Sequence, residues 1–343
     1  MTHCNYGSTR VIRPKNTLPQ TAEVIDNTMT LNANEMLIDV DTLNIDSASF
    51  TQLKKASNND ETLMKQMIID IVNEKGKMQN PVTKSGGMLI GKVSAVGKDF
   101  PNQTIKKGTK IATLVSLSLT PLKIDEIISI NMDNDQVKIK GQAILFASGI
   151  YAEIPSDLNE HLVLAALDVA GAPAQMNHLV KENDTVMVVG AGGKSGLLCA
   201  YQAKKLAGKN GKVIGFVNEQ NQVDLLKQLG FCDDIILGDA TDPLAVLESV
   251  KTVTDDALCD VVVNVVNVEN TEMSSILSTK DRGMVYFFSM ATSFTKAALG
   301  AEGVGKDINM LVGNGYTKDH ATITLDIMRE NKALHDLFMK KYA

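Results

Sequence analysis

The pattern of hydrophobic and polar positions changes near the middle of the chain. Up to about residue 155, short segments alternate between apolar and polar residues, most clearly at 36–40, 88–93 and 110–115. Glycines such as Gly97 and Gly108 stand between these segments. Alternation with a period of two is typical of half-buried strands, and glycine is typical of the turns that join them. This part of the chain is therefore predicted to be all-β, in the form of a small barrel.

One helix is predicted to interrupt this β-rich part. Over about 60–75, apolar residues recur at intervals of three and four, which places them on one face of a helix. Asn58 and Glu61 precede that stripe at the spacing of an N-terminal cap. We expect this helix to pack on the surface of the domain, with a lid over a cleft as the alternative.

Beyond about residue 180 the pattern becomes an alternation of strands and helices. The strands are apolar over most of their length, at 185–189, 212–217, 234–237, 260–266 and 283–288. Strands of this kind belong to a parallel sheet that helices cover on both faces. The predicted fold class is therefore α/β, with a doubly wound parallel sheet that follows a β-barrel domain.

The first of these apolar strands ends in a glycine-rich turn that opens a helix. The turn consists of Gly190, Ala191, Gly192, Gly193, Lys194, Ser195 and Gly196. Glycines in such a turn let the chain reverse tightly, let the backbone approach a pyrophosphate, and let the helix pack closely on the strand. The helix N-terminus adds free N–H groups and a partial positive charge. We predict that this turn binds a dinucleotide, as part of a Rossmann domain.

A phosphate loop of the NTPase type is the competing interpretation, because Gly193, Lys194 and Ser195 resemble the end of its motif. That motif requires glycine at position 188, where the chain has Val188. A second near match, at 300–307, has Asp307 in place of the magnesium-binding hydroxyl. Neither segment satisfies the motif, and the dinucleotide interpretation is preferred.

Polar residues after the later strands are predicted to contact the rest of the coenzyme. Asn218 and Glu219 follow the second strand, where an acidic residue commonly binds the adenosine ribose, and no arginine stands nearby to hold a 2′-phosphate. NAD is therefore expected, with NADP as the alternative. Asp239 is expected to border the adenine or to be only a turn residue. The ends of the next strands complete the set with Asn267, Ser289 and Met290.

The order of these segments resembles the medium-chain dehydrogenase/reductase superfamily. The segments 87–97, 107–112 and 151–155 are similar to the strand pair, the turn and the domain crossing of its GroES-like domain. The resemblance implies a GroES-like substrate domain at 1–155, to which 317–343 would return, and a Rossmann domain at 156–316. It also implies a homodimer or higher homo-oligomer, formed for example by pairing of two 283–288 strands.

The zinc ligands of the alcohol dehydrogenases in that superfamily are missing from this sequence. The segment 44–47 resembles the metal-free quinone reductase branch instead. The four cysteines have no metal-binding spacing to one another or to the histidines, so no metal is expected. They are Cys4, Cys199, Cys232 and Cys259.

A narrower resemblance covers the whole chain. The segments 43–52, 114–124, 168–175, 286–294 and 313–316 are similar to the family of dehydrogenases that act on 3,5-diaminohexanoate. This resemblance implies NAD-dependent oxidative deamination of (3S,5S)-3,5-diaminohexanoate to 5-amino-3-oxohexanoate and ammonia, in lysine fermentation. The alternatives are a zinc-free quinone or enoyl reductase that uses NADPH, and a dinucleotide-binding sensor without turnover.

Such a deamination requires groups that bind ammonium, take up a proton and activate water, and carboxylates suit these tasks. Asp168 is the first catalytic candidate, because it stands in an otherwise apolar helix. Its structural alternative is a helix-end residue that caps a neighbour. Asp46 is the second candidate, after a strand that would lead into the cleft, and its alternative is a turn residue bonded to local N–H groups.

Hydroxyl groups and charged side chains in loops are the candidates for binding the ends of the substrate. Glu302 is included because a glycine-rich loop around it could close over a ligand. Each candidate also has a plainer interpretation, as an ordinary loop hydroxyl or a solvated charge. The set is Ser47, Ser49, Lys84, Ser85, Glu302 and Lys306.

Composition narrows the setting in which such an enzyme would work. Hydrophobic residues make up 44% and charged residues 22% of the chain, which is typical of a globular protein. The net charge of -6, with both signs interspersed, argues against nucleic acid as a partner. Without an apolar signal segment or a membrane-spanning run, and with scattered cysteines, a cytoplasmic enzyme for a small amino-acid substrate is expected.

Overall fold

The computed structural model describes residues 4–133, 135–289, 291–313 and 315–342. The chain divides into two compact units, Met1–Leu164 with Tyr342–Ala343, and Ala165–Lys341. The division falls inside α3 (Glu160–Leu167), later than the expected boundary after residue 155. The start of α3 is bonded to the first unit, because Glu160 contacts Lys110 at 2.5 Å and His161 contacts Gln136 at 3.0 Å.

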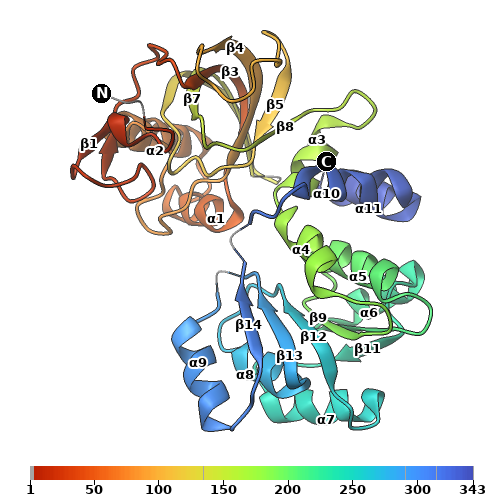
Figure 1. The fold of residues 1–343 in the computed structure, drawn as a ribbon. Coiled ribbons are helices and arrows are strands. Elements are labelled where there is room, and N and C mark those ends of the chain that lie inside the picture. Colours follow the sequence, from red (N-terminus) through yellow and green to blue (C-terminus); the bar gives the residue numbers. More distant parts are fainter. Residues whose placement is uncertain (1–3, 134, 290, 314, 343) are drawn as a thin grey trace. The chain divides into compact units, whose positions relative to one another are not determined.

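The first unit contains a six-stranded antiparallel sheet with the strand order β6-β7-β3-β4-β5-β8. Figure 1 labels β3, β4, β5, β7 and β8 of this sheet. Alternate residues of β3, namely Met36, Ile38 and Val40, are buried in the core, as the alternation in the sequence predicts. This sheet is the predicted GroES-like barrel. Its strands are β3 (Glu35–Asn44), β4 (Met88–Val96), β5 (Lys110–Thr113), β6 (Leu122–Asn131), β7 (Gln136–Phe146) and β8 (Tyr151–Glu153).

Helices α1 (Ser47–Ala56) and α2 (Glu61–Lys75) pack against the core of this unit. The predicted helix is confirmed, and it buries Met64, Ile68 and Val72, as a packing helix does. Its predicted cap is wrong, because Asp60 is the N-cap and accepts a 3.0 Å hydrogen bond from the Leu63 N–H. Asn58 has a left-handed backbone (φ 52°) and belongs to the turn between the two helices.

Two buried cationic side chains, of Arg10 and Lys77, connect the N-terminal segment to the rest of the first unit. Arg10 Nε donates to Glu35 Oε1 at 2.7 Å, and both side chains are almost fully buried. Lys77 is also buried, and its Nζ donates to the carbonyl oxygen of Pro19 at 2.6 Å. Burial lowers the pKa of Lys77 to about 8. The segment contains η1 (Ser8–Arg10), β1 (Val11–Arg13) and β2 (Val24–Ile25).

The second unit contains a six-stranded parallel sheet with the order β11-β10-β9-β12-β13-β14. The chain moves outward from β9 in one direction and then outward from β9 in the other, which is the doubly wound order of a Rossmann domain. The strands are β9 (Thr185–Val189), β10 (Lys212–Val217), β11 (Asp234–Leu237), β12 (Cys259–Asn264), β13 (Thr279–Phe287) and β14 (Asn309–Val312).

The short strand β14 was not predicted, and it changes the expectation for a dimer. It pairs with β13 through Met284–Phe287, while β12 pairs with the other side of β13. Both hydrogen-bonding edges of β13 are therefore occupied within the chain. The pairing of two 283–288 strands across a twofold axis, offered as an example of a dimer contact, is not available.

The C-terminal helices also differ from the expectation. The segment 317–343 is expected to return to the first domain, whereas residues up to Lys341 are grouped with the second unit and Tyr342–Ala343 with the first. Helix α10 packs on α4 and α5, and Thr324 donates a 3.3 Å hydrogen bond to the carbonyl oxygen of Ala170. The helices are α4 (Gly171–Leu179), α5 (Lys194–Ala207), α6 (Gln220–Leu229), α7 (Pro243–Thr254), α8 (Glu272–Ser278), α9 (Phe294–Gly303), α10 (His320–Glu330) and α11 (Lys332–Tyr342).

The four cysteines are free thiols with different surroundings. Cys199 and Cys259 are buried, and burial raises the pKa of Cys259 and of the partly buried Cys232 to about 12. Cys4 is partly exposed, and hydrogen bonds from Ser8 lower the pKa of its thiol. Over the described residues, the structure contains no helix with the length and apolar character needed to cross a membrane.

Candidate functional site

The glycine turn has the geometry of a phosphate cradle. Gly190 follows β9 with φ +89°, which favours glycine, and its N–H donates to the Phe216 carbonyl at 2.9 Å. A Cβ on Gly196 would lie 2.1 Å from the Gly190 oxygen, so the helix can approach the strand only because residue 196 lacks a side chain. Gly193 caps α5 and is exposed, and a Cβ there would meet no atom closer than 3.5 Å.

This cradle stands at the point where the strand order reverses. β9 lies between β10 and β12, and Val266, which follows β12, packs against Gly190. Ligands of doubly wound sheets bind in the crevice at such a point, outside the carboxyl ends of the strands. The N-terminus of α5 and the open face of Gly193 fit the pyrophosphate of a dinucleotide.

The predicted ribose and adenine contacts lie at the same edge of the sheet. Asn218 and Glu219 follow β10, are exposed, and precede α6. Asp239 follows β11, where its Oδ1 accepts hydrogen bonds from the N–H and the hydroxyl of Thr241, each at 2.8 Å. These bonds lower the pKa of Asp239. Such bonds are typical of a turn residue, which is one of the two predicted roles of Asp239; the other is a contact with the adenine.

The carboxyl ends of β12 and β13 bring the remaining coenzyme candidates to this edge. Asn267 is exposed after β12, and Ser289 follows β13 with its Oγ 3.2 Å from the Ala291 N–H. Met290 lies outside the described residues. Sequence reasoning missed the buried Asn264, whose Nδ2 donates to Thr271 Oγ1 at 2.9 Å and holds the loop after β12. An amide at the end of an apolar strand was the signal that could have identified it.

Asp168, the first catalytic candidate, forms an ion pair with a residue of the glycine turn. Its Oδ2 lies 2.5 Å from Nζ of Lys194, and both side chains are 24% exposed. Asp168 follows the end of α3, and Lys194 begins α5, so two predicted site residues that are far apart in the sequence meet in the second unit. The partner of Asp168 is thus a lysine at the expected phosphate site.

Asp46, the second candidate, is the N-cap of α1 in the first unit. Its Oδ1 accepts a 3.0 Å hydrogen bond from the Ser49 N–H, as in the turn interpretation. Its Oδ2 is buried and has no hydrogen-bond partner among the described residues. A buried carboxylate oxygen without a donor is destabilising, and a donor from a ligand would remove that cost.

Hydroxyl groups gather beside Asp46. Ser49 is buried, with its Oγ 2.5 Å from Thr83 Oγ1, which also accepts a 3.3 Å hydrogen bond from the Ser85 N–H. Lys84 is exposed between these residues. Ser47 points elsewhere, because its hydroxyl donates to Asp135 Oδ2 at 2.7 Å. The structure therefore brings Ser49 and Ser85 together and keeps Ser47 engaged with Asp135.

Glu302 and Lys306 lie at the wrong edge of the parallel sheet for the predicted site. Lys306 Nζ donates to the carbonyl oxygen of Thr279, the first residue of β13, at 2.6 Å. Glu302 is exposed at the end of α9, which runs back from the carboxyl edge toward the start of β14. The amino ends of parallel strands are at the opposite edge from the glycine turn. The predicted substrate contacts of Glu302 and Lys306 therefore lie at the edge opposite the glycine turn, and their role stays a prediction.

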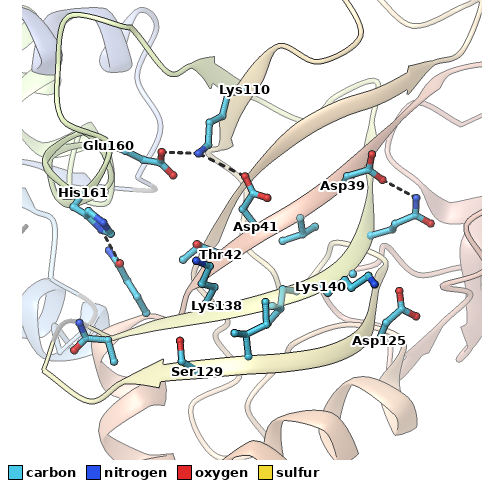
Figure 2. Close-up of a pocket in the computed structure, with 17 residues that line it drawn as sticks. Asp39, Asp41, Thr42, Lys110, Asp125, Ser129, Lys138, Lys140, Glu160 and His161 are labelled. Carbon is cyan, nitrogen blue, oxygen red and sulfur yellow. Dashed lines mark hydrogen bonds and ion pairs between the residues drawn. The ribbon is translucent and has the colours of Figure 1, made fainter.

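A charged groove of about 1020 Å³ lies on the sheet of the first unit, and sequence reasoning did not anticipate it (Figure 2). Residues 39–42 of β3 and 138–142 of β7 line it. Its charges are partly paired, because Lys110 lies 2.5 Å from Glu160 and 3.5 Å from Asp41. In the part of the chain that the structure describes, no group of three or more His, Cys, Asp or Glu side chains could hold a metal ion.

Comparison with known proteins adds an independent line of evidence. A family model of the L-erythro-3,5-diaminohexanoate dehydrogenase N-terminal domain matches residues 9–155. The L-erythro-3,5-diaminohexanoate dehydrogenase of Acetoanaerobium sticklandii is 56% identical over 343 residues, which cover 100% of both chains. The protein of the same name from Fusobacterium nucleatum subsp. nucleatum is 57% identical over 340 residues, which cover 99% of each chain.

Solved structures with the same fold are more distant in sequence. The CurK enoyl reductase aligns with a TM-score of 0.57 at 15% identity, over 89% of this chain and 82% of that one. A mycobacterial quinone oxidoreductase aligns with a TM-score of 0.57 at 18% identity, over 91% and 86%. The Escherichia coli quinone oxidoreductase complexed with NADPH has a TM-score of 0.53 at 16% identity, over 92% and 85%. These alignments confirm the predicted fold.

Proposed function

This chain belongs to the L-erythro-3,5-diaminohexanoate dehydrogenase family, and we propose that it catalyses the NAD-dependent oxidative deamination of (3S,5S)-3,5-diaminohexanoate in lysine fermentation. C3 of the substrate loses a hydride and its amino nitrogen loses a proton. One water molecule then hydrolyses the imine to 5-amino-3-oxohexanoate and ammonia. Identity of 56% and 57% over the full length of two relatives of that name carries this proposal.

The glycine turn and the strand ends around it are the proposed coenzyme site. Bound NAD would accept the hydride from C3. The backbone N–H groups at 194–196 and the Lys194 ammonium would hold its pyrophosphate, and Asn218 and Glu219 its adenosine ribose. Asn267 and Ser289 lie at the ends of β12 and β13, where the nicotinamide half is expected.

NAD is proposed over NADP because of the residues that follow β10. The segment 218–222 is Asn-Glu-Gln-Asn-Gln, with no arginine or lysine to pair with a 2′-phosphate. Glu219 would face that phosphate with a like charge. Lys212 is at the far end of β10, where it lies 3.1 Å from Asp234. Charge complementarity at this edge therefore favours a free ribose hydroxyl.

Two carboxylates are proposed to bind the ammonium groups of the substrate and to take up a proton from them. The substrate carries two ammonium groups and one carboxylate, so binding requires anionic side chains and at least one cation or hydroxyl donor. Asp168 and Asp46 are the proposed catalytic carboxylates. Ser49, Ser85 and Lys84 are proposed to bind the charged ends of the substrate, and Ser47 joins them in spite of its bond to Asp135.

The test is an assay of the purified protein with 3,5-diaminohexanoate at alkaline pH. NADH formation is followed by absorbance, with NADP in a parallel reaction, and ammonia is measured at the end. We expect one ammonia per NADH and a preference for NAD. Oxidation of NADPH by quinones without this reaction would instead support the reductase that the fold relatives suggest, and NAD binding without turnover would support a sensor.

We also propose that the enzyme works as a cytoplasmic homodimer. The free thiols of all four cysteines suit a reducing compartment. Light scattering coupled to gel filtration should give twice the chain mass of 37.0 kDa. A mass equal to that of one chain would contradict this part of the proposal.

A further inference from the structure

The ion pair between Asp168 and Lys194 joins the glycine turn to the segment before α4. Lys194 is the first residue of α5, directly after the capping Gly193. Its Nζ lies 2.5 Å from Asp168 Oδ2. At 24% exposure for both side chains, the pair is partly shielded from water and still within reach of a ligand.

A lysine is an unfavourable residue at the start of a helix. The helix N-terminus carries a partial positive charge, and a cation there is disfavoured. The first turn of α5 contains no acidic residue that would offset this cost. The Lys194 ammonium and the helix dipole therefore concentrate positive charge at one place, and the Asp168 carboxylate lies beside it.

The pyrophosphate of the coenzyme is expected at this same place, where it would compete with Asp168 for the lysine. Phosphate groups bind at helix N-termini through backbone N–H groups and the dipole. The ammonium of lysine is a point charge on a flexible stem, so it can turn from one anion to another. We propose that coenzyme binding transfers the Lys194 ammonium from Asp168 to the pyrophosphate, and that the released carboxylate then binds an ammonium group of the substrate.

This inference rests on the proposed function, since it requires a substrate that carries ammonium groups. It gives Asp168 two successive partners and makes the substrate site depend on the coenzyme site. A partly buried carboxylate without a cation is costly, so Asp168 attracts the substrate ammonium most strongly once Lys194 has left it. The substrate therefore binds more tightly after the coenzyme has bound.

Calorimetry on the wild type tests whether bound coenzyme raises the affinity for the substrate, without any substitution. The Kd of 3,5-diaminohexanoate is measured in the absence of coenzyme and with saturating NADH, which cannot accept a hydride. We expect binding at least about tenfold tighter in the presence of NADH, the scale of one charge-assisted hydrogen bond. Equal affinity under the two conditions would overturn the proposal.

Two variants separate the roles of the paired residues. Lys194→Met should weaken NAD binding by about tenfold or more, and Lys194→Arg should restore part of it. Asp168→Asn should bind NAD as tightly as the wild type or more tightly, because the competing carboxylate is gone, and should lose the tighter substrate binding. If Asp168 only holds the lysine in place, Asp168→Asn weakens NAD binding as Lys194→Met does, and the exchange is refuted.

A second ion pair on α5 provides the matched control. Lys204 Nζ lies 2.6 Å from Asp233 Oδ1, away from the glycine turn. Lys204→Met and Asp233→Asn should change neither affinity by more than about twofold, as expected for an exposed ion pair. The melting temperature of each variant checks its folding. Failure of the wild type to oxidise 3,5-diaminohexanoate would refute the proposed function, whereas refutation of the exchange leaves that turnover unchanged.

Discussion

Two glycines of the phosphate cradle face different neighbours, and this difference leads to a prediction. An alanine Cβ at position 196 would lie 2.1 Å from the Gly190 oxygen, whereas one at position 193 would meet no atom closer than 3.5 Å. We expect Gly196→Ala to lower both the melting temperature and the affinity for NAD. Gly193→Ala should lower the affinity alone, because the backbone at 193 must approach the phosphates. Thermal unfolding and calorimetry of the two variants check this, and equal melting temperatures would contradict it.

The buried Lys77 predicts a pH dependence of stability. Its pKa is about 8 in the folded protein and about 10.4 in an unfolded chain. Between these values the unfolded chain binds a proton that the folded protein does not, so the free energy of unfolding rises with pH. Relative to Lys77→Met, the wild type should gain up to about 3 kcal/mol from pH 7 to pH 10.5.

Urea unfolding of both proteins at several pH values provides the measurement. Lys77→Met removes both the hydrogen bond to Pro19 and the desolvation cost of the ammonium, so the slope and not the level reports on the titration of Lys77. Lys107 is exposed, and Lys107→Met should retain the wild-type slope. Parallel slopes for the wild type and Lys77→Met would show that the pKa of Lys77 is the same in the folded and unfolded chain and would contradict the prediction.

At the scale of single residues, the sequence indicates which side chains could carry the chemistry, but it does not indicate which residues they contact. Asp168 was selected because a carboxylate in an apolar helix needs a partner, but its partner is 26 positions away along the chain. Glu302 and Lys306 were selected for a glycine-rich loop, and that signal does not say which edge of the sheet the loop occupies. The position of each residue depends on a tertiary contact, of Asp168 with Lys194 and of Lys306 with Thr279.

At the scale of elements, the apolar strands were predictable because a strand buried on both faces has no polar positions to confuse the pattern. β9, β10 and β12 fall where that pattern placed them. β14 was missed because it has only four residues, all of them partly or fully exposed. Without β14, β13 was mistaken for an edge strand, and the example of a dimer contact followed from that error.

The cap of α2 gives a prediction at this scale. The Asp60 side chain accepts the Leu63 N–H at 3.0 Å and satisfies one of the free N–H groups of the first turn. Asp60→Ala should lower the free energy of unfolding by about 1 kcal/mol, and Asp60→Asn by a few tenths at most. Denaturant unfolding measures both. Turnover should be unchanged in the two variants, and an equal loss of stability in both would argue against the cap.

At the scale of the whole molecule, the two-domain organisation was predictable from the change of period, but the assignment of the last helices was not. The amphipathic pattern of α10 shows that one face is buried and does not show against which domain. Contact with α4 and α5 decided this, together with the bond from Thr324 to Ala170. Similarly, the start of α3 joined the first unit through the side chains of Glu160 and His161.

Coenzyme binding should stabilise the folded protein and slow amide hydrogen exchange in one part of the second unit. NAD at about 100 times its Kd should add about 2.7 kcal/mol to the stability of the folded state. Hydrogen exchange followed by mass spectrometry should show slower exchange at 190–197 and 264–268, on the carboxyl edge of the sheet. Residues 302–308, on the opposite edge, should exchange at unchanged rates. Protection at 302–308 comparable to that of the glycine turn would contradict this expectation and would support the predicted roles of Glu302 and Lys306.

The unequal surroundings of the four thiols make the native chain suitable for site-selective conjugation. Burial keeps Cys199 and Cys259 away from reagents, and the raised pKa of Cys232 keeps it protonated near neutral pH. Cys4 is partly exposed, and its lowered pKa favours the reactive thiolate. A maleimide dye should therefore attach near the N-terminus in a one-to-one ratio, and a fluorescent enzyme for single-molecule studies could be prepared without removing any native cysteine.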